Sequence, residues 1–268
     1  MNQQENQYQI KIELKSDAIF TNGEKQRNVV QSRALTDEDG FVYLHAKSLK
    51  GHLKKQAFWL LHKYDNVYQN VNEINETEKS YVKQRRDQFL TSIEVLFGLN
   101  GWEKKLFIPV DMKVQSEHPT QSLIKLGHLQ LPQRVRQYFT QLFHDEASAQ
   151  YVQLNKQELL EAQSNIRTYI QLEQTGVVKD NQLASFHTVK RGLVFFADIY
   201  IQPDPINKFY KANDFNAYLD DLSLIVKSMR VIGAGVHRGT GNIKAELLLN
   251  GQPYNSASLG SKQGEMTP

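Results

Sequence analysis

Four glycines, a histidine and an arginine stand within nine residues near the C-terminal end of the sequence. The segment GAGVHRGTG, residues 233–241, includes Gly235, His237, Arg238 and Gly239. Glycine lets a backbone approach a partner closely and point its N–H groups outward, and arginine carries a charge suited to phosphate. We call this segment the glycine-rich loop, and its composition indicates contact with a phosphate backbone.

The elements predicted around this loop exclude two common phosphate motifs. Apolar residues at helical spacing predict a helix over residues 214–232 with Asp214 as its N-cap, and NIKAELLLN, residues 242–250, reads as a strand. Dinucleotide-binding loops and P-loops run from a strand into a helix, the reverse of this order. The alternative is an ordinary helix-to-strand connection with incidental glycines.

A second basic segment is SLKGHLKK, at the start of a predicted amphipathic helix over residues 48–64. Ser48 is the N-cap candidate, and Lys50 and Lys54 stand near its N-terminal turn. A lysine-rich helix with a buried apolar face can follow a phosphate backbone, and its dipole adds attraction for anions. The alternative is that these lysines are simply solvated.

Candidate catalytic side chains are few. Asp37 and Asp39 stand beside Gly40, where an acidic turn is their ordinary role. A carboxylate that reaches a bound Mg²⁺ or Mn²⁺ can help it to activate a hydroxyl, but spacing alone does not establish that reach. His45 and His52 are candidate general bases beside the basic segment, and His237 is another within the glycine-rich loop. A polar or stacking role is the alternative for each.

The histidines lack the spacing of a metal site such as HExxH, so we expect no structurally bound metal or other cofactor. Four aromatic residues are candidates for stacking on bases or for the core: Tyr43, Phe58, Trp59 and Phe186.

Composition bounds the class of protein. The 268 residues contain no cysteine, which excludes disulfides, zinc-thiolate sites and cysteine nucleophiles, and the formal net charge of +3 does not by itself imply nucleic acid. The polar N-terminus lacks a secretory signal, and no segment approaches the roughly 20 apolar residues that span a bilayer. We expect a cytoplasmic protein without a membrane partner.

The remaining pattern predicts an α+β fold. Residues 7–14 alternate apolar and polar side chains as a strand does. Further strands are predicted over 104–114, 166–173 and 193–201, a solvated and partly helical insertion over 65–95, and a second insertion over 115–165 with helices near 135–143 and 156–163. Without the insertions the order is βαββαβ, a ferredoxin-like (RRM-like) core. We expect one domain over residues 1–255 and a disordered tail over 256–268.

Four segments, in order, resemble the RAMP superfamily (repeat-associated mysterious proteins) of CRISPR-associated proteins. DGFVYLHAKSLKGHLKK resembles its Gly-x-x-Tyr-Ile-Pro-Gly-Ser-Ser-Leu-Lys-Gly element. VLFGLNGWEKKLFIPVDMKV is similar to its Leu-Phe-Gly element followed by a strand with an Asp. IGAGVHRGTGNIKAEL resembles its closing glycine-rich loop. The third element in the chain is carried by Arg167, Thr175, Gly176, Gly192 and Phe195.

The set looks closest to the repeated backbone subunit of type III effector complexes. The resemblance implies binding of CRISPR guide RNA, with target RNA, other effector subunits and further copies of the chain as partners, and a hairpin that displaces a base. The RNA-binding residues that it implies are Ser48, Lys50, Lys54, Arg167, Lys190, Arg191, Gly235, His237, Arg238 and Gly239.

Two departures from the family pattern concern different properties. His45 and Ala46 stand where Pro-Gly is usual, which bears on the guide contacts that the resemblance implies. Gln26, Arg27 and Asn28 precede Val29 where target-cleaving relatives carry an Asp, and this favours a guide-holding subunit over an enzyme. Three alternatives stay open. One is a target-cleaving endoribonuclease using Asp37 or Asp39, another a guide-processing endoribonuclease using His45 or His52, and the third an interaction module without RNA.

Overall fold

The structure of the chain is a computed structural model. It describes residues 6–21, 33–70, 76–112, 121–144, 155–172, 178–202 and 214–255, without the side chains of 169–184. Several predictions lie outside these residues. They are the segment 26–30, Thr175, Gly176 and the tail 256–268.

The predicted first strand is the centre of the main sheet. It forms β1 (Tyr8–Leu14), in which every second side chain is buried. Its two neighbours are β7 (Val194–Ile201) and β8 (Ile243–Leu249), and both pair with it antiparallel. Ile10 and Ile12 are fully buried, because they face the helices from the middle of the sheet.

Short strands complete this sheet on both sides. Its order is β2-β4-β7-β1-β8-β9, and β3 also pairs with β7. The added strands are β2 (Tyr43–Leu44), β3 (Ile124–Leu126), β4 (Leu129–Gln130) and β9 (Gln252–Pro253). The predicted insertion 115–165 therefore supplies sheet strands as well as helices.

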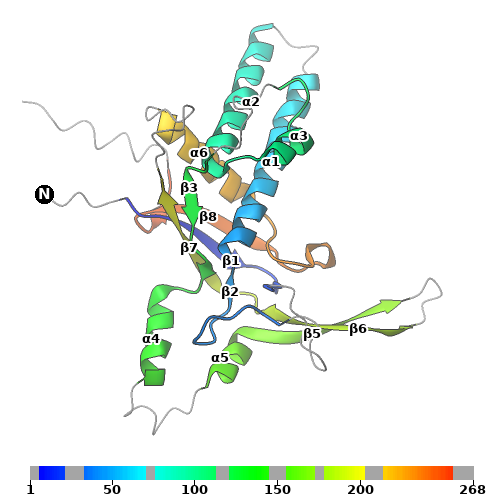
Figure 1. The fold of residues 1–268 in the computed structure, drawn as a ribbon, viewed down its shortest axis with the longest axis vertical. Coiled ribbons are helices and arrows are strands. Elements are labelled where there is room, and N and C mark those ends of the chain that lie inside the picture. The colour runs from blue at the N-terminus through cyan, green and yellow to red at the C-terminus, as the bar shows by residue number, and fades with distance from the viewer. Residues whose placement is uncertain are drawn as a thin grey trace, which may run out of the picture.

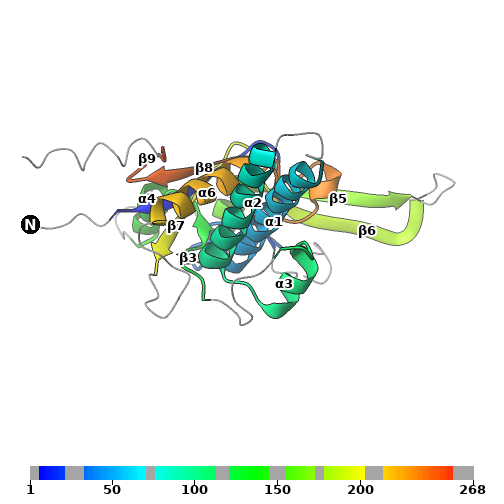
Figure 2. The ribbon, with the colours of Figure 1, turned by 90° about the horizontal axis from the view of Figure 1, so that it is seen from above.

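Three helices pack together against one face of the sheet (Figures 1 and 2). They are α1 (Ala46–Asn70), α2 (Glu76–Phe97) and α6 (Phe215–Ser228). The solvated insertion predicted over 65–95 is wrong for the second half of α2, where Phe89, Ile93 and Leu96 are fully buried in the core. In the sequence, the apolar residues of this half of α2 are interspersed with polar and charged residues. In the structure, α2 packs against both α1 and α6.

The strand predicted over 104–114 is wrong. The structure has helix α3 (Gly101–Phe107) instead, and Ile108 ends it in an extended conformation. Asn100 and Glu103 start this helix by exchanging side-chain and backbone hydrogen bonds, at 2.8 Å and 3.0 Å. Such a capping box fixes a helix start and here outweighs the strand preference of the apolar residues.

A two-stranded hairpin projects from the body of the molecule (Figures 1 and 2). It consists of β5 (Ser164–Leu172) and β6 (Val178–Val189). The strand predicted over 166–173 is thus present, but its place in the core sheet is wrong because its partner is β6. The predicted helices before it are confirmed as α4 (Gln133–His144) and α5 (Lys156–Gln163).

The predicted helix cap at Asp214 is confirmed in position, and the one at Ser48 is wrong. Asp214 is the N-cap residue of α6, although its side chain makes no capping hydrogen bond. Ser48 lies inside α1, and the Nδ1 of His45 accepts a hydrogen bond from the backbone N–H of Lys47 at 3.1 Å. None of the helices in the described ranges is both long and apolar enough to cross a membrane.

Candidate nucleic-acid interface

The short segment after β1 joins the projecting hairpin to the glycine-rich loop. Ala18 forms an antiparallel bridge with Val189 at the end of β6, and Ile19 forms one with Ala234 in the loop. The backbone hydrogen bonds between Ala18 and Val189 measure 3.0 Å and 2.7 Å, and the N–H of Ala234 donates to the carbonyl of Ile19 at 3.0 Å. The end of β6 and the glycine-rich loop, which are distant from each other in the sequence, therefore both bond to the same short segment.

Asp17 is the polar centre of this junction. Its side chain is only 7% exposed, and its carboxylate lies 2.7 Å from the Arg167 guanidinium of β5. The same carboxylate accepts the backbone N–H of Arg191 at 3.0 Å. The backbone carbonyl of Asp17 accepts the N–H of Gly241 at 2.8 Å. Asp17 thus connects two predicted RNA-binding residues with the glycine-rich loop. Sequence reasoning missed it, because a lone Asp after a strand carries no distinctive signal.

Close packing requires two of the glycines in the glycine-rich loop, and a third lies beside open space. A Cβ on Gly233 would lie 2.5 Å from the carbonyl oxygen of Ile19, and one on Gly241 would lie 2.0 Å from that of Ile232. These two glycines are required because the chain packs against itself. Gly239 has positive φ with no neighbouring atom within 4 Å of such a Cβ, so its open side faces free space.

Between these glycines, residues Val236–Arg238 form a single 3-10 turn with His237 and Arg238 exposed. Ser16 holds the loop, because its hydroxyl donates to the carbonyl of Gly239 at 3.2 Å and accepts the N–H of Asn242 at 2.9 Å. The loop is therefore fixed to the support after β1 while its basic side chains are presented outward.

His52 connects helix α1 to the same loop. Its Nε2 accepts the backbone N–H of Gly233 at 3.1 Å, and burial, with a smaller effect from Lys55, lowers the pKa of His52. A neutral imidazole with an occupied Nε2 is suited to holding the loop. The Nε2 atom of His52 is thus occupied by a structural contact, and its predicted role as a general base stays a prediction.

The lysines of α1 are more enclosed than the sequence predicts. Lys54 pairs with Glu103 at 2.7 Å, and both side chains are under one-fifth exposed. Lys50 donates to the hydroxyl of Ser122 at 2.9 Å, and burial is the main cause that lowers its pKa. Ser48 and Lys47 are exposed in the first turns of the helix. Lys47, which sequence reasoning did not single out, lines a pocket with Lys50 and Lys125.

The hairpin residues are placed around its base. The Arg167 side chain is 55% exposed despite its pairing with Asp17. Arg191 is exposed in the turn between β6 and β7. The Nζ of Lys190 donates to the carbonyls of Glu161 and Ala162 at 2.8 Å and 2.9 Å, which caps the C-terminal end of α5.

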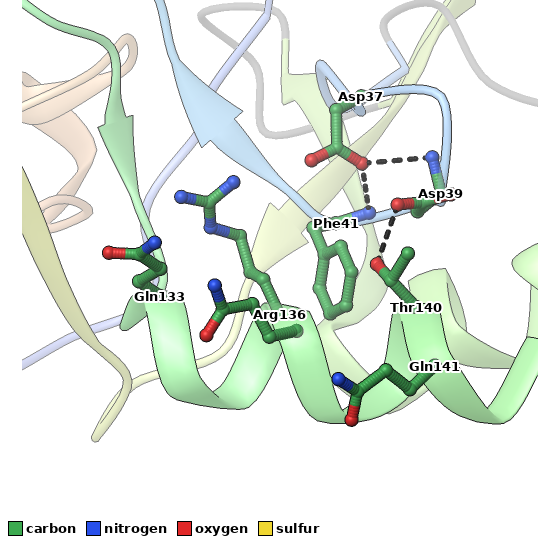
Figure 3. Close-up of a pocket in the computed structure, with 8 residues that line it drawn as sticks. Asp37, Asp39, Phe41, Gln133, Arg136, Thr140 and Gln141 are labelled. Carbon is green, nitrogen blue, oxygen red and sulfur yellow. Dashed lines mark hydrogen bonds between the residues drawn. The ribbon is translucent and has the colours of Figure 1, made fainter.

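Asp37 and Asp39 lie apart from these residues, in a pocket of about 390 Å³ that Arg136 and Thr140 also line (Figure 3). Asp37 accepts the backbone N–H groups of Asp39 and Phe41 at 3.2 Å and 2.9 Å, the bonding of an acidic turn. Asp39 accepts the Thr140 hydroxyl at 2.7 Å. Their predicted catalytic role stays a prediction.

This pocket does not fit a divalent metal on its own residues. One oxygen of each carboxylate already has a protein donor, and the Arg136 cation stands in the same pocket. The described parts of the chain contain no group of three or more Asp, Glu or His side chains placed to hold an ion. We therefore derive no metal-dependent step from it.

Asp111, which belongs to the segment resembling the family's Leu-Phe-Gly element, has a structural contact. Asp111 pairs at 3.0 Å with Arg86, whose side chain is only 1% exposed, and Asp65 pairs with the same guanidinium at 2.5 Å. Tyr68 lies under this guanidinium, 4.2 Å from ring centroid to cation. The cluster ties α1, α2 and the segment after α3 together, because an unpaired buried arginine would be costly.

Fold and site together define an α+β protein whose antiparallel sheet carries a cluster of basic side chains around the end of its central strand. A family model of the RAMP superfamily matches residues 11–248. The chain belongs to the RAMP superfamily, as the four sequence elements predicted.

Solved structures share this fold. A chain of the type III-B Cmr-beta bound to cognate target RNA matches with a TM-score of 0.53 and 12% identity over 90% of this chain and 96% of that one. A chain of the type III-B Cmr-beta in its apo state matches with a TM-score of 0.50 and 14% identity over 91% and 97%. No curated protein sequence matches significantly.

Proposed function

We propose that this chain is a guide-RNA-binding backbone subunit of a cytoplasmic type III CRISPR effector ribonucleoprotein. Target RNA, other effector subunits and copies of the chain itself are its proposed partners. The observation that carries the proposal is the junction at Asp17, which gathers the Arg167 and Arg191 of the hairpin base beside the glycine-rich loop. Membership of the RAMP superfamily and a fold shared with a chain from a target-RNA-bound type III-B structure support it.

We further infer a ferredoxin-like core. The chain order strand β1, helix α1, strand β3, strand β7, helix α6, strand β8 has the βαββαβ pattern, and the spatial order β8-β1-β7-β3 supports this inference. In this reading, α2, α3 and the hairpin with α4 and α5 are additions between core elements. The base of the hairpin would then lie beside the bound guide, close to the glycine-rich loop.

The salt dependence of RNA binding tests the proposal. Binding of the purified chain to single-stranded RNA should weaken with salt, and replacing a lysine or arginine that contacts a phosphate should reduce the slope of log affinity against log salt by about one. We expect this for Arg191→Ala and for Arg238→Ala, whose side chains are exposed. Lys83→Ala on α2, an exposed lysine outside the proposed interface, is the matched control. Equal slopes for all three variants and the wild type would contradict the proposal.

Cleavage of target RNA is measured separately. The effector ribonucleoprotein that contains the chain is purified and incubated with RNA complementary to its guide and Mg²⁺ or Mn²⁺. Cleavage by the wild type is compared with cleavage by Asp37→Ala and by Asp39→Ala. Cleavage at regular intervals that either substitution abolishes would establish the endoribonuclease. Intact target RNA would leave guide holding as the function of the chain.

A further inference from the structure

A pocket of about 320 Å³ opens between the middle of α1 and the segment that follows α6. Trp59 lines it from the helix, and Val231 and Val236 line it from the opposite side. Trp59 is 52% exposed and Val231 is 38% exposed, whereas the neighbouring Phe58 is buried in the core. A half-exposed indole beside a cavity is a flat apolar platform suited to stacking with another planar ring.

The charges around this platform are positive. Lys55 and Arg230 line the pocket, and the Nζ of Lys63 lies 5.2 Å from the centroid of the Trp59 ring. No Asp or Glu is among the described residues that line it. A ligand that matches both features has a planar ring and carries negative charge beside it, which describes a nucleotide.

The pocket shares a wall with the glycine-rich loop. Val236 begins the 3-10 turn that also contains His237 and Arg238. His52 also lines the pocket, and its Nε2 accepts the N–H of Gly233 at 3.1 Å. An RNA strand whose phosphate contacts Arg238 therefore passes beside the opening of the pocket.

We propose that this pocket binds one base of a single-stranded RNA, stacked on Trp59, while Lys55 and Arg230 contact the adjoining phosphates. The inference rests on the proposed RNA-binding function and adds a base-binding site to it. The volume is at the small end of the roughly 300–1,000 Å³ of ligand pockets, which fits a single base. Stacking tolerates every base, so the site should show little sequence preference.

The two tryptophans of the chain allow a direct test. Trp102 on α3 is 67% exposed and does not line the pocket, so it is the matched control for Trp59. The probe is an oligoadenylate of about 12 nucleotides, within the usual size of single-strand sites. In the Trp102→Phe variant we expect the RNA to quench the fluorescence of Trp59. In the Trp59→Phe variant, RNA should leave the remaining fluorescence unchanged.

Affinity gives a second measurement. Trp59→Ala should weaken binding of the oligoadenylate about 5- to 150-fold, the range for loss of one stacked base, and Trp102→Ala should leave it unchanged. An oligomer of the same length without bases should bind the wild type and Trp59→Ala equally. Circular dichroism of each variant confirms that it is folded.

The outcomes separate this inference from the proposed function. If Arg238→Ala reduces the salt slope but Trp59→Ala binds as the wild type does, the base site is wrong and RNA binding stands. If the RNA does not bind at all, both fail. A change in Trp59 fluorescence with protein concentration and without RNA would overturn the base site in favour of an interface between copies of the chain.

Discussion

Replacing Asp17 should loosen the junction between the hairpin and the glycine-rich loop. In Asp17→Ala, Arg167 loses its carboxylate partner and the backbone N–H of Arg191 loses its acceptor. The ion pair contributes about 1 kcal/mol, since the Arg167 side chain is 55% exposed and solvent screens it. The hydrogen bond to the charged, buried acceptor adds about 1.5–2 kcal/mol. We expect a total loss of about 2.5–3 kcal/mol in the free energy of unfolding.

Urea unfolding at neutral pH measures this loss, provided that the slope of the unfolding free energy against urea concentration is the same in the variant and the wild type. Asp17→Asn keeps an acceptor for the N–H of Arg191 but removes the charge, so it should lose about 1 kcal/mol. Arg167→Ala, combined with Asp17→Ala in a double-mutant cycle, isolates the ion pair. A stability for Asp17→Ala within about 0.5 kcal/mol of the wild type would refute the role given to this carboxylate.

Two further predictions concern the glycine-rich loop. Gly241→Ala should destabilise the chain by at least about 2 kcal/mol more than Gly239→Ala. Both glycines have positive φ, and a side chain in that backbone conformation costs about 1–2 kcal/mol. Only the Cβ of Gly241→Ala would also meet a backbone oxygen, at 2.0 Å. Urea unfolding of the two variants checks this, and equal losses would contradict the close packing of Gly241. The second prediction concerns His52, whose pKa burial lowers, so that the unfolded chain binds the proton first as the pH falls. The contribution of His52 to stability is therefore complete above its ordinary pKa of about 6.5 and decreases by up to about 1.4 kcal/mol per pH unit below it. Unfolding from pH 7.5 to 5 should show a shallower decrease for His52→Gln than for the wild type, and parallel curves would contradict this assignment.

Local sequence patterns were sufficient for several elements. The strict alternation of residues 7–14 and the helical spacing of 214–232 predicted β1 and α6, because each element buries one continuous apolar face. The signal for α3 was also present in the sequence, as Asn100 and Glu103 at capping-box spacing. The apolar residues at 106–110 by themselves favour a strand, and the capping box before them outweighs that preference.

Partners distant in the sequence decided the rest. β6 is polar and shows no clear period, and it forms a strand because β5 pairs with it. The burial of Arg86 depends on Asp65 and Asp111, which approach it only when α1, α2 and the segment after α3 are packed. No window of sequence contains that information.

In the candidate interface, too, some features follow from local sequence and others from contacts between distant residues. The sequence by itself determined which residues carry positive charge, where glycine permits unusual backbone angles, and the four elements of the RAMP superfamily. Only the tertiary structure decided how enclosed each of these charges is: Lys54 pairs with Glu103 and is under one-fifth exposed, whereas Arg191 lies exposed in a turn. It also placed Asp17 between the hairpin and the loop and left Trp59 uncovered beside a pocket, because burial and pairing depend on neighbours that the fold brings together.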